Sequence, residues 1–181
     1  MALVQFFSAM SVDGFIAGPD HELDWLTQYE SEDGETADFS SYERFLDGVG
    51  ALAMGARTYE FILAEASAWP YGDRPTWIFT HGEHPPIDGA DLRWASAPPG
   101  EVIDEVRTAA GERNVWLVGG GQLAAQFLEE GLLDELILSV VPIFLEQGIP
   151  LLPRRTESPM RLTGTDVQDS GIVELHYEIR R

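Results

Sequence analysis

Three consecutive glycines, at positions 119–121, follow an apolar tetrapeptide at 115–118 and precede a segment with helical spacing, QLAAQFL. A helix that begins directly after a buried strand points free backbone N–H groups, with about half a positive charge, beyond the strand end. Glycines also let a ligand approach the backbone closely. The unit is suited to a phosphate. A plain tight turn stays an equal alternative, and the spacing is not the G-x-G-x-x-G fingerprint of an ordinary Rossmann site.

A second strand end runs into a helix start at residues 53–61, AMGARTYEF. Arg57 and Thr58 fall in the first turn, where a guanidinium and a hydroxyl can both bind phosphate. An arginine considered alone is more often a surface cation. A third feature, the Gly/Pro-containing loop SVDGFIAGPDHELDW at residues 11–25, could cover a ligand, although most acidic turns are only turns.

Other kinds of catalysis have little support. The chain has no cysteine and no lysine, which excludes thiolate, Schiff-base and P-loop-lysine chemistry. Among the four histidines only His81 and His84 are close in sequence, and no compact set of carboxylates accompanies them, so we expect no metal site. A G-x-S-x-G nucleophile motif is also missing.

The net charge is strongly negative, with 11 basic residues, all arginine, against 31 acidic ones and a formal charge of −20. Such a field repels nucleic acid and anionic membranes, so we expect neither as a partner. Any phosphorylated cofactor needs a local arginine or a helix N-terminus. The first residues lack the basic region of a signal peptide, and no apolar run reaches the roughly 20 residues of a membrane helix. A cytoplasmic protein is the expectation.

The pattern of elements predicts an α/β fold. Strands are expected at 3–10, 51–54, 76–80, 91–95, 115–118 and 135–141, and helices at 38–47, from about 56, at 101–111 and at 122–131. Two further strands are expected in the tail, at 160–170 and 171–180. Strands that alternate with helices and then give way to strands indicate a mostly parallel central sheet with an antiparallel C-terminal edge and helices on both faces. The length of 181 residues suits one domain, residues 1–181.

Together these motifs resemble the dihydrofolate-reductase-like superfamily. The chain is most similar to the C-terminal reductase domain of bacterial bifunctional riboflavin-biosynthesis deaminase/reductases and their stand-alone relatives. The resemblance runs from about residue 3 to 152, through SAMSVDGFIAG, MGARTYE, TWIFTHG and VWLVGGGQLAAQFLEEGLLDEL. It implies a three-layer fold in which NADPH lies across the C-terminal ends of the strands.

The resemblance also implies roles for individual residues. Gly119, Gly120 and Gly121 would approach the pyrophosphate and nicotinamide, with Gln122 and Leu123 beside them. Gly55, Arg57 and Thr58 would hold the pyrophosphate, and Thr80 and His81 would lie near the adenosine ribose and its 2′-phosphate. Ala17 and the loop through Trp25 would cover the nicotinamide. The remaining expectation concerns the proton, for which Asp38, or a water held near Asp13, is the candidate source.

Two departures from the superfamily pattern bear on the ligands. Ala56 stands where dihydrofolate reductases commonly have a basic residue, and Glu146 stands where relatives usually have glycine. Two apolar stretches expected near a sheet edge, LILSVVPIFL and GIVELHYEIR, predict a homodimer assembled through the C-terminal strands, and the resemblance supports pairing. The resemblance also implies hydride transfer to a small heterocyclic or ribosylaminopyrimidine-like substrate, as in 5-amino-6-(5-phosphoribosylamino)uracil reductases. A true dihydrofolate reductase and a nucleotide-binding dimer without catalysis remain open alternatives.

Overall fold

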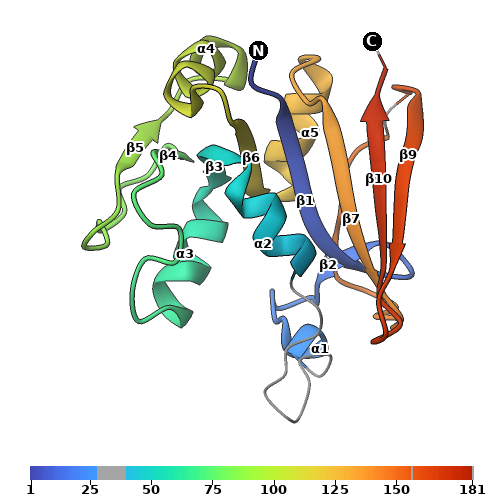
Figure 1. Cartoon of the computed structure of the whole chain (residues 1–181). Helices are drawn as coiled ribbons and strands as arrows, with labels where there is room; N and C mark the ends of the chain where they lie inside the picture. Colours follow the sequence, from blue (N-terminus) through green and yellow to red (C-terminus); the bar gives the residue numbers. More distant parts are fainter. Residues whose placement is uncertain (28–39, 156, 181) are drawn as a thin grey trace.

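A computed structural model of the chain describes residues 1–27, 40–155 and 157–180. Its centre is an eight-stranded sheet in the order β5-β4-β3-β6-β1-β7-β10-β9, and two short strands, β2 and β8, pair separately (Figure 1). The strands are β1 (Val4–Ser11), β2 (Phe15–Ala17), β3 (Val49–Gly55), β4 (Thr76–Phe79), β5 (Leu92–Ala95), β6 (Asn114–Gly119), β7 (Glu135–Val141), β8 (Ile149–Pro150), β9 (Met160–Val167) and β10 (Val173–Ile179).

The sheet is parallel from β5 to β7 and antiparallel where β10 joins β7 and β9 joins β10. This confirms the predicted mostly parallel sheet with an antiparallel C-terminal edge. The two apolar stretches behind the predicted dimer form β7 and β10, which lie near this edge but do not form it. The strand at this edge is β9, whose residues are almost all exposed.

Helices cover both faces of the parallel part of the sheet. They are α1 (Asp24–Thr27), α2 (Ser40–Asp47), α3 (Ala56–Glu65), α4 (Pro99–Ala110) and α5 (Gly121–Glu129). Side chains that alternate along β1, β3 and β6 divide the core into two layers. Val4, Phe6 and Leu117 pack with α4 and α5, whereas Leu52, Met54 and Trp116 pack with α2 and α3. The three-layer arrangement confirms the predicted fold class.

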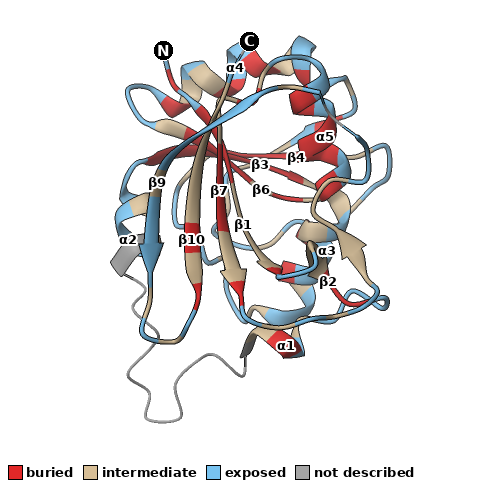
Figure 2. Ribbon diagram, turned by 90° about the vertical axis from the view of Figure 1, so that its right-hand side faces the viewer, coloured by how far each residue is buried: buried red, intermediate tan, exposed pale blue. Residues whose placement is uncertain are grey.

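Burial follows this division, as Figure 2 shows: β3, β6 and α5 are largely buried, while β9 is exposed along its length. The C-terminal ends of the parallel strands lie together on one side of the sheet, where β3 leads into α3 and β6 into α5. Ligands of open α/β sheets bind at these C-terminal strand ends. Within the described part of the chain, no helix has the length and apolar character needed to cross a membrane.

Candidate functional site

The two predicted strand-to-helix turns meet at the C-terminal ends of the parallel strands. An added Cβ on Gly120 would lie 4.0 Å from Gly55 Cα and 3.9 Å from Thr58 Oγ1. These residues come from turns that are more than 60 positions apart in the sequence, and they are neighbours because β3 and β6 pair in parallel. The structure therefore brings together Gly55, Thr58 and the three glycines in one cradle.

The glycines of this cradle have little room for side chains. A Cβ on Gly119 would stand 3.0 Å from Thr58 Oγ1, and one on Gly121 would stand 2.4 Å from the Leu151 carbonyl oxygen. Gly120 has a φ of 92°, a conformation that residues with a side chain rarely adopt. Close packing explains Gly119 and Gly121, whereas backbone conformation explains Gly120, where an added Cβ would make only ordinary van der Waals contacts.

Both helices that begin at the cradle have N-termini without a capping side chain. Gly55 and Gly120 are the N-cap residues, and no acidic residue occurs in the first turn of α3 or α5. In contrast, α4 carries Glu101 in its first turn, and its Gly100 N–H donates to Glu130 Oε2 at 2.7 Å. In a chain with 31 acidic residues, two acid-free helix starts at one point form a local positive region suited to an anion.

Arg57 lies in the first turn of α3, and its side chain contacts the loop that precedes α1. Its Nη1 is 2.8 Å from Nε2 of His21, a residue that the sequence analysis did not identify. Gln122 is exposed in the first turn of α5, whereas Leu123 is buried in the core beneath the cradle. Sequence alone offered no signal for His21, because its partner is 36 residues away and no motif links the two.

Asp13 ties the β1–β2 turn to the segment before β8. Its Oδ1 accepts from Ser11 Oγ at 2.6 Å and from the Leu145 N–H at 3.2 Å, and its Oδ2 accepts from the Glu146 N–H at 2.8 Å. The hydrogen bond from Ser11, with smaller contributions from the two backbone N–H groups, lowers the pKa of Asp13 below its ordinary value. The geometry gives this carboxylate a structural task. Its proposed link to proton delivery stays a prediction.

Ala17 and Trp25 lie on either side of His21 in the sequence, and both are buried. Trp25 packs in a small cluster with Val141 and Ile172, so it anchors α1 to the ends of β7 and β10. Ala17 lies in β2, and a Cβ on Gly148 would stand 2.2 Å from its carbonyl oxygen. Both residues therefore hold the segments that border the cradle, and their predicted contact with a nicotinamide is untested.

His81 follows β4, and so does Thr80, which was expected to be the last residue of this strand. A third residue of that loop completes their surroundings. His84 Nε2 is 2.9 Å from Thr80 Oγ1, its Nδ1 is 3.3 Å from Glu60 Oε1, and its ring stacks on Trp94. His81 is exposed. From the sequence, His84 is a candidate only for metal binding, and among the described residues no group suited to a metal occurs. Asp38, the other candidate proton source, lies outside the described residues.

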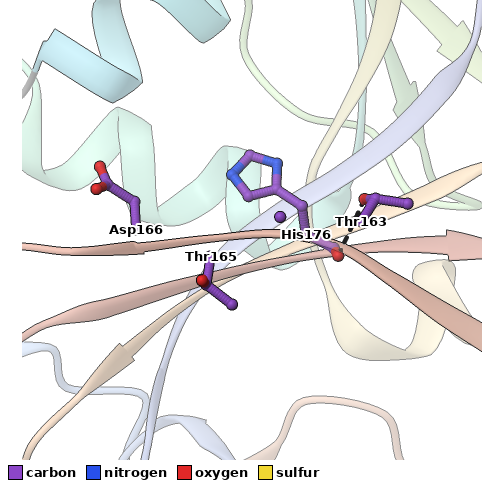
Figure 3. Close-up of a pocket in the computed structure, with 5 residues that line it drawn as sticks. Thr163, Thr165, Asp166 and His176 are labelled. Carbon is purple, nitrogen blue, oxygen red and sulfur yellow. Dashed lines mark hydrogen bonds between the residues drawn. The ribbon is translucent and has the colours of Figure 1, made fainter.

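A separate polar hollow of about 350 Å³ lies on the other half of the sheet, against α2. Its lining includes Gln5, Glu135 and the buried Glu174, whose Oε1 is 2.7 Å from His176 Nε2. Figure 3 shows a shallower hollow beside it, in which His176 and Asp166 project from β10 and β9. Neither hollow is lined by a residue of the cradle.

Comparison with known families gives one match. The model of the RibD C-terminal domain matches residues 63–173, a range that contains the three glycines. Among curated proteins, the uncharacterized protein YwjB of Bacillus subtilis is 32% identical over 94% of each chain. The riboflavin biosynthesis protein RibD of Corynebacterium ammoniagenes is 26% identical over 80% of this chain and 44% of its own length.

Solved structures agree in fold. A putative riboflavin biosynthesis protein from Shewanella sp. PV-4 superposes with a TM-score of 0.82 at 24% identity, and the match covers both chains completely. RibD of Acinetobacter baumannii superposes with a TM-score of 0.70 at 17% identity, over 99% of this chain and 58% of that one. The fold is thus that of the riboflavin-biosynthesis reductases, which is dihydrofolate-reductase-like.

Proposed function

Because the chain belongs to the family of RibD C-terminal domains, we propose that it is an NADPH-dependent reductase that transfers hydride to a small heterocyclic or ribosylaminopyrimidine-like substrate. The family relationship supports a riboflavin-biosynthesis reductase-like function at the coarse level. The dinucleotide, its 2′-phosphate and the substrate belong to the proposal. So does the assignment of residues 1–181 to one reductase domain.

The observation that carries the proposal is the convergence of two uncapped helix N-termini on the glycines 119–121. A dinucleotide pyrophosphate needs a close approach to the backbone, several N–H donors and a cation. The cradle offers each of these: Gly120 has no side chain, α3 and α5 present N–H groups without capping side chains, and Arg57 lies in the first turn of α3. The residues present therefore fit the cofactor that the family implies.

When bound, the dinucleotide would supply the hydride, so the chain needs no nucleophile and no thiol. The task of its own residues is positioning and the exclusion of water. Gly55, Arg57 and Thr58 would hold the pyrophosphate from α3, and the glycines would hold it from α5. Thr80 and His81 would lie at the adenosine end. Asp38 and a water near Asp13 remain the candidates for the proton.

The experiment is a binding titration of NADPH against Gly120→Val, with Gly131→Val as its matched control. Both glycines have positive φ, at 92° and 67°, so valine strains the backbone at each. Gly131 has no atom within 4 Å of an added Cβ and lies past the other end of α5. We expect Gly120→Val to weaken NADPH binding at least tenfold, and Gly131→Val to leave it unchanged while lowering thermal stability. Equal affinity of the two variants for NADPH would show that the cradle is not part of the cofactor site.

A second readout separates binding from turnover. NADPH oxidation in the presence of ribosylaminopyrimidine acceptors is the expected activity. Binding that never leads to oxidation would favour the nucleotide-binding dimer without catalysis. Inhibition by an antifolate would favour a true dihydrofolate reductase.

A further inference from the structure

We infer that the acceptor reduced at this site carries no phosphate group. The inference rests on the proposed function and concerns the substrate class of the same site. It sets the chain apart from the structurally similar Thermotoga maritima protein, whose name includes 5-amino-6-(5-phosphoribosylamino)uracil reductase, an activity on a phosphorylated substrate. The observation behind it is the distribution of arginines over the fold.

Arg57 is the one arginine, among the ten that the structure describes, that lies at the cradle. Arg74 donates to the carbonyl oxygens of Leu46, Tyr71 and Val49, and Val49 is at the opposite end of β3 from Gly55. Arg93 lies over the Trp77 ring and pairs with Asp91 and Glu105. These two arginines contact the sheet away from the C-terminal strand ends, where the cradle lies.

The other arginines are also placed elsewhere. Arg107 pairs with Asp134, which precedes β7, and Arg161 pairs with Glu178 at the C-terminal end of β10. Arg154 pairs with Glu129, at the opposite end of α5 from Gly120, and Arg155 pairs with Glu157. Of the remaining three, Arg44 lies in the hollow beside α2, Arg113 in the turn before β6, and Arg180 directly after β10.

The undescribed segments add almost no basic residue. Residues 28–39 contain five acidic residues and no basic one, and Arg181 directly follows Arg180. Lysine is absent from the chain. The only cationic side chain at the cradle, among the described residues, that could bind a phosphate on the acceptor is therefore that of Arg57, which the cofactor pyrophosphate already requires under the proposed function.

The residues around the cradle are acidic instead. Asp20 and Glu22 flank His21, Glu60 lies one turn after Arg57, and Glu146 neighbours the Asp13 network. Both nitrogens of His84 are within contact distance of Thr80 and Glu60, and His81 is assigned to the 2′-phosphate. A second phosphate dianion would meet like charges without a cation of its own, whereas an uncharged acceptor would not.

The test uses a matched pair of ligands: 5-amino-6-ribosylaminouracil with and without its 5′-phosphate, titrated calorimetrically into protein saturated with NADP⁺. We expect the dephosphorylated form to bind at least tenfold more tightly. We also expect salt to act with an unusual sign: raising the salt concentration from 50 to 500 mM should tighten the binding of the phosphorylated form, because it screens repulsion, and leave the other form unchanged. Tighter binding of the phosphorylated form, or its weakening by salt, would overturn the inference.

A pair of charge reversals localises the effect. Glu146→Arg places a cation beside the site and keeps a side chain at the same positive φ of 64°, whereas Glu112→Arg makes the same charge change in the turn before β6. We expect Glu146→Arg to improve binding of the phosphorylated ligand severalfold and Glu112→Arg to change it much less. Equal effects of the two substitutions on binding of the phosphorylated ligand would mean that only the net charge of the protein matters, which would contradict the inference.

Failure of the proposed function has a different signature. If the wild-type protein does not bind NADP⁺ in the first titration, the cofactor assignment fails before either pyrimidine is added. If NADP⁺ binds and the phosphorylated pyrimidine is preferred, the cofactor assignment stands and the inference about the acceptor alone is wrong.

Discussion

The imidazole Nε2 of His21 and the Nη1 of Arg57 lie 2.8 Å apart, which docks the loop before α1 onto the first turn of α3. The loop is a tight turn, in which the Gly18 N–H donates to the Glu22 carbonyl at 3.1 Å and the His21 N–H donates to the Gly18 carbonyl at 3.1 Å. Because the guanidinium can only donate, the imidazole accepts through Nε2. A ligand phosphate that binds the Nη1 of Arg57 replaces this contact.

His21→Ala is expected to tighten NADPH binding, because the variant frees the Nη1 of Arg57 for the ligand phosphate. A hydrogen bond of this kind contributes about 0.5–1.5 kcal/mol, which corresponds to roughly a two- to twelvefold lower Kd. Calorimetry measures the change, and His176→Ala, on β10 in the separate hollow, is the control with unchanged affinity. Weaker binding by His21→Ala would instead make His21 a phosphate ligand.

Asp13→Asn is expected to destabilise the fold at neutral pH, because the amide cannot accept all three hydrogen bonds. The folded-state pKa of Asp13 is lowered below its ordinary value of 3.8, mainly by Ser11. Its contribution to stability is thus complete above about pH 3.8 and is lost as the pH falls through the lower folded value. Thermal unfolding at several pH values should show a difference from wild type at pH 7 that shrinks below pH 3.8. A constant difference would contradict the linkage, and loss of turnover without loss of stability would support a role in proton delivery.

The preference for NADPH over NADH is expected to be modest. Ala56 begins α3 where the superfamily resemblance implies a base, and one missing charge-assisted hydrogen bond corresponds to about 1.5–3 kcal/mol, or roughly 10- to 150-fold in affinity. The ratio of the two dissociation constants should stay below about a thousandfold. Ala56→Arg should raise that ratio about tenfold or more, whereas Ala56→Gln, of similar length but uncharged, should not. A larger ratio in the wild-type protein would require a cation that the cradle does not contain.

Pairing of two chains through β9 is the remaining prediction. Met160, Leu162 and Val167 are 46%, 51% and 71% exposed on this edge strand, and an open edge with apolar side chains favours association. Light scattering should give a dimer mass at micromolar concentration and moderate salt. Leu162→Glu should yield monomers, and Val12→Glu, at a residue 48% exposed outside the sheet edge, should not. A monomer mass for the wild-type protein would contradict the prediction.

Local pattern in the sequence was sufficient for the fold class. The apolar run before Gly119 and the helical spacing after Gly121 depend only on neighbouring residues, so β6 and α5 were predicted close to their observed bounds. The expectation that Glu146 replaces a glycine also has a local explanation, since its φ of 64° is a conformation that glycine adopts without strain. Hydrophobic period leaves a mark on the sequence at the residues concerned, whereas the positive φ of His21 and Glu146 leaves none.

The tertiary structure decided which of these turns meet and which strand lies at the edge. The contact of Gly120 with Thr58 depends on the pairing of β3 with β6, and the docking of His21 on Arg57 depends on the path of a loop 36 residues away. The exposed position of β9, rather than β10, depends on the strand order. Such contacts join residues that are distant in the sequence, and neither residue type nor spacing encodes them. The free energy of packing the whole sheet selects among the possible pairings.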